Sequence, residues 1–219
     1  MKPRGLLAEE MNSLRRELAL MAAVAGENLG KALSALHGGD AALAQEALEG
    51  DKKVDSLELK IEDMALVLIA TQQPVAGDLR ELVTVLKITG NLERIGDYAS
   101  HLSRAAEKFS KQPPFRSLEH IERMAETGQE MLKETFSAYL ARDPAAARRA
   151  ASFDAKIDNE HKELTEEVLK LMKKKPELVK GAARLLKLSG SMERLGDHIT
   201  NICEGIIYMI EGRHEELNG

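Results

Sequence analysis

The sequence predicts an all-α protein, and three observations carry this prediction. The composition favours helix formers and is poor in aromatic residues, with 3 % Phe, Trp and Tyr and no Trp at all. No segment alternates apolar and polar residues as a half-buried strand does, so no sheet is expected. Apolar residues instead recur at helical spacing between prolines and glycines that suit helix ends.

These breaks divide the chain into six long segments. Proline is tolerated in the first turn of a helix and disrupts its interior, so Pro74, Pro144 and Pro176 mark helix starts. A Gly-Gly-Asp sequence at residues 38–40 ends one helix and caps the next. Helices are therefore expected near residues 6–37, 40–72, 74–111, 117–142, 144–174 and 176–211.

The six segments are interpreted as two copies of three rather than as one bundle. Residues 86–97 (LKITGNLERIGD) match residues 186–197 (LKLSGSMERLGD), 100 positions later. Residues 51–55 match residues 154–158 in the same order, 103 positions later. Two matches at nearly one offset indicate an internal repeat of about half the chain. We expect tandem three-helix units at residues 1–112 and 113–219, divided at a linker that contains two prolines.

Charge and cysteine content exclude several classes of protein. A net charge of −5 and the lack of Trp argue against a nucleic-acid-binding protein. The single Cys203 rules out an intrachain disulfide and a zinc site built from cysteines. The longest apolar run, residues 65–70, is far shorter than the roughly 20 residues of a membrane span, and no signal peptide is recognisable. We expect a cytoplasmic protein with no direct membrane span.

Each repeat carries two pairs of acidic residues spaced four positions apart. The pairs are Asp51 and Asp55, Glu93 and Asp97, Asp154 and Asp158, and Glu193 and Asp197. Residues four apart share one face of a helix, where like charges repel each other. Either basic neighbours such as Arg94 and Arg194 or a bound cation must therefore offset the repulsion.

The helical phase places these acids outside the core. On the third and sixth segments they lie opposite two apolar stripes, which are Ile88, Leu92, Ile95, Ala99 and Leu102, and Leu188, Met192, Leu195, Ile199, Ile202 and Ile206. Two facing rows of carboxylates would suit Mg, Mn, Fe or Zn ions. The alternative is a solvated acidic surface, but four pairs in register favour a metal site or a partner surface.

Four glycines accompany the acids inside the expected helices. They are Gly90, Gly96, Gly190 and Gly196. A glycine inside a helix costs about 1 kcal/mol relative to alanine. Their matched positions therefore indicate the close approach of a helix or a ligand.

Other motifs are weak or missing. No Gly-rich phosphate loop and no serine triad is present. The nearest Glu-x-x-His-like pair, Asp158 and His161, is expected to face outward, which argues against a ferritin-like di-iron centre. The remaining histidines His37, His120 and His214 are expected at the surface.

Three segments resemble the PhoU family of phosphate-transport accessory proteins. Residues 73–80 (QPVAGDLR) and 92–97 (LERIGD) are similar to the first repeat of that family. Residues 192–209 (MERLGDHITNICEGIIYM) are similar to its second repeat. The resemblance extends over nearly the whole chain and agrees with the repeat and the length.

The resemblance implies a fold, a metal site and a role. It implies two three-helix bundles related by pseudo-two-fold symmetry, with multinuclear iron or zinc clusters bound at the four acidic pairs named above. It implies a non-enzymatic, homodimeric negative regulator of phosphate uptake and phosphate-starvation signalling. Such a regulator would link the ATPase subunit of the phosphate ABC transporter to a phosphate-sensing histidine kinase. His101 and Arg104 stand where the second repeat has Asn201 and Glu204, so the two sites can differ.

Two alternatives remain open at this stage. A metal-dependent hydrolase could use the carboxylates catalytically, with His101, His161 or His198 as the base. A purely structural helical adaptor would need no metal.

Overall fold

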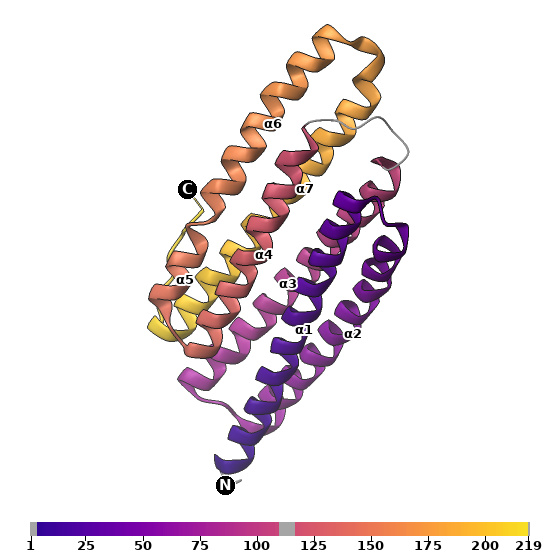
Figure 1. Cartoon of the computed structure of the whole chain (residues 1–219). Coiled ribbons are helices and arrows are strands. Elements are labelled where there is room, and N and C mark those ends of the chain that lie inside the picture. The colour runs from indigo at the N-terminus through magenta and orange to yellow at the C-terminus, as the bar shows by residue number, and fades with distance from the viewer. Residues whose placement is uncertain (1–3, 110–116, 219) are drawn as a thin grey trace.

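The computed structural model describes residues 4–109 and 117–218, and every regular element in these ranges is helical (Figure 1). In chain order the elements are α1 (Arg4–Gly38), α2 (Ala41–Gln72), α3 (Ala76–Phe109), α4 (Leu118–Ala141), α5 (Pro144–Ala151), α6 (Asp154–Lys174), the 3-10 turn η1 (Pro176–Leu178) and α7 (Val179–Glu211). The all-α prediction is confirmed. The predicted boundary between residues 112 and 113 lies outside the described residues.

The helix ends follow the local signals in the sequence. Asp40 Oδ1 accepts hydrogen bonds from the backbone N–H groups of Ala42 and Leu43, at 2.9 and 3.2 Å. Asp143 caps α5 in the same way, and Pro144 occupies the first turn. These carboxylates satisfy N–H groups that have no partner within the helix, which explains why the helices start there.

The expected fifth helix is interrupted at Ser152 and Phe153. The hydroxyl of Ser152 donates to the carbonyl oxygen of Arg149 at 2.7 Å, and the Phe153 N–H bonds the carbonyl of Ala150, three residues back. This tighter turn separates α5 from α6, because a serine hydroxyl competes for the helix carbonyls. The break also places Asp154 in the first turn of α6.

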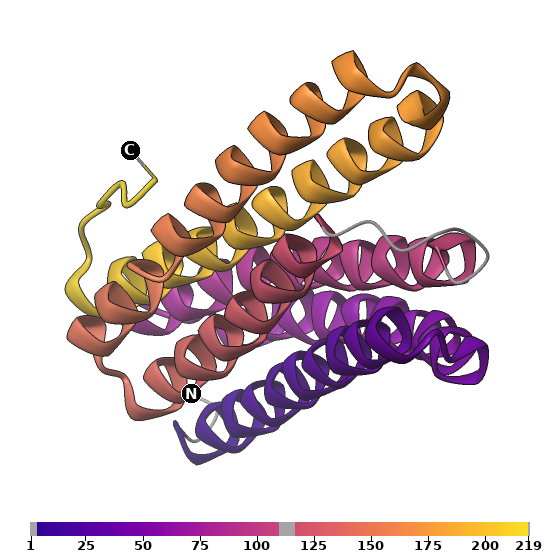
Figure 2. The same ribbon diagram turned by 45° about the horizontal axis from the view of Figure 1, so that its top comes forward.

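The two repeats form two bundles that lie side by side. Helices α1, α2 and α3 pack against one another, and α4, α6 and α7 form the second bundle, with α5 against α4 and α7. The bundles meet where α3 packs on α7 and α1 on α4 (Figure 2). Helices α3 and α7 run antiparallel, since Gly205 lies against Thr84 and Ile88 whereas His198 contacts Asn91.

The apolar stripes predicted from the sequence form the core. Every residue of the two stripes on α3 and α7 is buried, from Ile88 to Leu102 and from Leu188 to Ile206. Removing this apolar surface from water is the main source of stability, at about 25 cal/mol per Å². Within the described residues, no helix is long and apolar enough to cross a membrane.

A buried carboxylate connects the two bundles. Glu81 of α3 is 4 % exposed and accepts hydrogen bonds from Arg15 of α1 and from Arg142, which follows α4. Burial raises the pKa of Glu81, but the bonds from both guanidinium groups outweigh it and hold the pKa below its usual value. The ionised carboxylate thus fixes three helices relative to one another.

We expect Glu81→Gln to lower the free energy of unfolding by about 1–3 kcal/mol at pH 7, because both arginines lose their charged partner. A lowered pKa contributes stability above the unfolded value and loses it as the pH falls through the folded one. The deficit should therefore begin to shrink below about pH 4 and disappear as the pH falls through the lowered pKa of Glu81. Urea unfolding at pH 7 and across this acidic range measures the difference in the free energy of unfolding, with the exposed Glu9→Gln as control. Equal stability of Glu81→Gln and the parent chain at pH 7 would contradict this role.

Candidate metal centre

The structure brings the acidic pairs of α2 and α3 together on one face of the first bundle. We call this set acid row 1, and it comprises Asp51, Asp55, Glu58, Glu93 and Asp97. Their charges act across the two helices, since Asp97 and Asp55 both contribute to raising the pKa of Asp51 and Glu58. None of these acids belongs to the core, as the helical phase predicts.

The second bundle repeats the arrangement on α6 and α7. Acid row 2 comprises Asp154, Asp158, Glu193 and Asp197. Asp158 is exposed and the other three are half-buried. Asp158 and Asp197 both act on the pKa of Asp154, so the predicted pairs of this repeat also face each other.

Two of the four glycines explain how closely the rows approach. A Cβ atom on Gly196 would collide with Asp154 Oδ1 and lie 3.1 Å from Ile157 Cδ1. A Cβ atom on Gly96 would lie 2.9 Å from Asp51 Oδ1. A residue with a side chain at either position would displace the carboxylate, so glycine leaves the space that Asp154 occupies on α7 and Asp51 on α3. Gly90 and Gly190 face open space and leave room above the helix surface.

Several carboxylates in each row have a raised pKa and therefore resist ionisation. Burial is the largest cause, and it raises the pKa of Asp51, Glu93, Glu193 and Asp197. Burial, followed by the charges of Asp158 and Asp197, raises the pKa of Asp154 to about 6. A nearby cation would favour the ionised forms and remove this cost.

The counter-charges differ between the two rows. Arg94 binds Glu93 at 3.2 Å and Asp97 at 3.1 Å, so row 1 carries the basic partner that a solvated surface would need. Its counterpart Arg194 makes no ion pair with any residue in the described ranges. In row 2, moreover, Asp154 Oδ1 is buried without a hydrogen-bond partner, although Thr200 donates to the other oxygen at 3.3 Å.

Row 2 therefore fits a cation better than row 1 does. An orphaned carboxylate oxygen among three further acids is the donor set that hard and borderline divalent cations prefer. In neither row do carboxylate oxygens from three different residues lie within 4.8 Å of one another. Exposed Asp55 and Asp158 would have to rotate to reach a common ion with their neighbours.

One compact group of potential ligands was missed by the sequence analysis. Within residues 4–109 and 117–218, the ligand atoms of His120, Glu160 and Glu163 lie within 4.8 Å of one another. His120 is 7 % exposed, so its expected surface position is wrong. Its Nδ1 lies 2.6 Å from Glu160, whose carboxylate also accepts two bonds from Arg123 at 2.8 Å. Because Arg123 already neutralises Glu160, we interpret the group as a set of polar contacts that stabilises the packing of α4 against α6.

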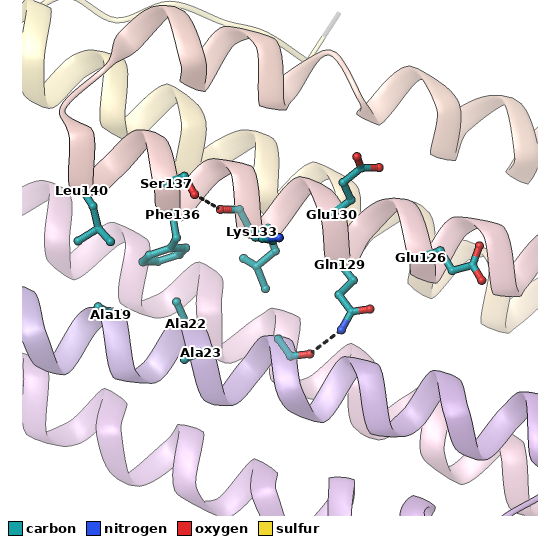
Figure 3. Close-up of a pocket in the computed structure, with 12 residues that line it drawn as sticks. Ala19, Ala22, Ala23, Glu126, Gln129, Glu130, Lys133, Phe136, Ser137 and Leu140 are labelled. Atoms are coloured by element: carbon teal, nitrogen blue, oxygen red, sulfur yellow. Dashed lines mark hydrogen bonds between the residues drawn. The ribbon is translucent and has the colours of Figure 1, made fainter.

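A groove of about 640 Å³ lies between α1 and α4, away from both rows (Figure 3). Alanines of α1 and the side chains of Phe136 and Leu140 line it. Gln129 Nε2 donates across it to the carbonyl oxygen of Gly26 at 3.4 Å. The two acids that line the groove, Glu126 and Glu130, belong to neither acid row, and no histidine is among the described residues that line it.

We expect Asp154→Asn to stabilise the metal-free protein by about 1–2 kcal/mol at pH 7.5, a figure already reduced for partial exposure to water. The raised pKa means that the native state binds more protons between about pH 4 and 6, so stability falls as the pH rises through this window. The gain should therefore disappear at pH 4. Thermal unfolding in chelator measures it, with the exposed Asp63→Asn as control. An equal gain at both pH values, or in the control, would contradict the assignment.

Known proteins are similar to this chain in sequence over most of its length. The PhoU domain profile matches residues 18–106 and 121–206, one copy in each bundle. The phosphate-specific transport system accessory protein PhoU of Escherichia coli K12 is 34 % identical over 212 residues, covering 95 % of this chain and 87 % of that protein. The PhoU homologue of Caulobacter vibrioides is 35 % identical over 210 residues, covering 95 % and 90 %. These relatives are named as accessory proteins rather than by a catalysed reaction.

Solved structures agree with the fold. PhoU from Pseudomonas aeruginosa superposes with a TM-score of 0.90 at 29 % identity, covering 94 % of this chain and 99 % of that one. The phosphate transport system regulatory protein PhoU from Streptococcus pneumoniae gives 0.88 at 25 % identity, covering 96 % and 99 %. Since the domain profile matches both bundles and the relatives cover most of the chain, the chain belongs to the PhoU family.

Proposed function

We propose that this chain is a non-enzymatic regulator that limits phosphate uptake and represses phosphate-starvation signalling. The observation that carries the proposal is the match of both bundles to proteins named as accessory or regulatory in phosphate transport. Its partners would be the ATPase subunit of the phosphate ABC transporter and a phosphate-sensing histidine kinase. It would act in the cytoplasm as a homodimer, through contacts of its helical surfaces.

The acid rows would hold iron or zinc in this role. The ligands would be the oxygens of Asp51, Asp55, Glu93 and Asp97 in row 1 and of Asp154, Asp158, Glu193 and Asp197 in row 2. The raised pKa values and the orphaned Asp154 Oδ1 support this assignment. The bound cations would hold α2 against α3 and α6 against α7, since the facing carboxylates otherwise repel one another.

Metal content tests the ligand assignment. We expect gently purified protein to contain iron or zinc by mass spectrometry, and Asp97→Ala with Asp197→Ala to lose most of it while keeping its helical circular dichroism. Asp63→Ala with Glu166→Ala, which removes two exposed acids outside the rows, is the matched control. The same metal content in both double variants would overturn the assignment. Metal-dependent release of phosphate from a monoester would favour the hydrolase alternative instead.

Regulation is tested in a bacterium that lacks its own PhoU protein. Such cells are expected to express a phosphate-starvation reporter even in phosphate-rich medium, and this chain should return the reporter to the level of the parent strain. The physical reason is that the helical surfaces of the two bundles would restore contact between transporter and kinase. Immunoblotting controls for expression. A chain that accumulates in folded form and leaves the reporter on would contradict the proposed role.

A further inference from the structure

A basic groove lies between α3 and α7, and none of the residues of the two acid rows lines it. Its volume is about 300 Å³, and buried Phe109 and Leu188 supply an apolar floor. Arg104, Lys108, Arg184 and Lys187 stand around it, together with His101, Ala105 and Ser191. None of the described residues that line the groove is acidic, although the whole chain carries a net charge of −5.

The four cationic side chains form no ion pair with any described residue. By contrast, Arg15, Arg123 and Arg148 are all paired with glutamates. Cations gathered around an apolar floor repel one another and attract anionic groups. The arrangement therefore suits a ligand that offers both negative charge and some apolar surface.

The internal repeat provides a second, related groove at the other end of the same interface. The residues Lys87, Asn91, Asn201, Glu204, Gly205 and Tyr208 line it, and each is the 100-residue counterpart of a residue that lines the basic groove. The C-terminal segment of this chain, residues 213–218, runs along this second groove without helical structure. The fold thus already places an irregular peptide at one of its two equivalent positions.

The contacts of that segment indicate what the basic groove would accept. The backbone N–H of Leu217 donates to Glu204 at 2.7 Å, and the ring of His214 stacks on Tyr208 with 4.1 Å between centroids. In the basic groove Arg104 replaces Glu204 and Lys108 replaces Tyr208. Both replacements are hydrogen-bond donors only, so a complementary segment must present carboxylates and carbonyl oxygens.

We propose that the basic groove binds an extended acidic peptide segment of a partner protein. From His101 to Phe109 the groove follows α3 for about 12 Å, which is the length of about four extended residues. Glutamate or aspartate side chains of the segment pair with Arg104, Lys108, Arg184 and Lys187, and an apolar side chain between them covers Phe109 and Leu188.

The test uses a fluorescein-labelled hexapeptide of sequence Glu-Leu-Glu-Glu-Leu-Glu, followed by fluorescence anisotropy with the full chain in chelator. We expect binding with a Kd below about 100 µM in low salt, weakening as salt is added. Lys187→Glu should weaken binding at least about tenfold. The matched control is Lys87→Glu, which makes the same charge change at the equivalent position of the second groove and should alter Kd less than about twofold.

Several outcomes would overturn the proposal. They are no binding to the parent chain, equal loss in the two variants, and equal binding of a peptide with Gln in place of Glu. Tight binding of inorganic triphosphate without binding of the peptide would make the groove a site for small phosphate anions. Dissociation of a dimer by Lys187→Glu, with peptide binding unchanged, would assign the groove to a second copy of this chain. Both lysines are exposed, so thermal unfolding should be the same for both variants.

Discussion

The rest of the structure is arranged around two carboxylates, each of which lies in the close contact, or seam, between two packed helices. Asp154 lies against Gly196 and Asp51 against Gly96, and neither glycine could carry a side chain without moving the acid. Burial makes each charge costly, and the neighbouring acids raise the cost further. The chain also gives up helix stability, because an interior glycine is about 1 kcal/mol worse than alanine. These costs in stability are the physical basis of the cation site that we propose at the acid rows.

The two halves share the packing at this seam but differ in the charged residues around it. The buried stripes and the glycines are the same in both, and so is the contact of an aspartate with the third long helix of its bundle. Row 1 has an ion-paired cation in Arg94, whereas Arg194 makes no ion pair with any described residue of row 2 and Asp154 Oδ1 has no hydrogen-bond partner. At the α3–α7 interface, one groove is basic and the other carries Glu204 and the C-terminal segment. Duplication therefore preserved the packing rules, and divergence changed the charges that face outward.

Much of this could be predicted from the sequence, because the relevant signals are local. Caps such as Asp40 and Asp143 act within three residues, and the stripe from Ile88 to Leu102 follows from helical periodicity alone. The break at Ser152 was missed because a serine inside a helix is usually tolerated, and only its bond to Arg149 ends the helix. The burial of His120 and the contacts of Glu81 were missed for another reason. Glu160 lies 40 positions from His120, and Arg142 and Arg15 lie 61 and 66 positions from Glu81, so only tertiary packing brings these partners together.

The acid rows and the basic groove are neighbours, and this has a physical consequence. Arg104 lines the groove and also lowers the pKa of Asp51 in row 1, so the charges of the two surfaces act on each other. A cation bound in row 1 would cancel negative charge beside the groove and so strengthen its attraction for an acidic segment. By linkage, the segment would strengthen cation binding by the same factor. Row 2 has no equivalent arginine, because Glu204 stands in its place. Cations in the two rows would therefore have unequal effects on a partner, which gives the sequence difference between the halves a functional reading that packing alone does not provide.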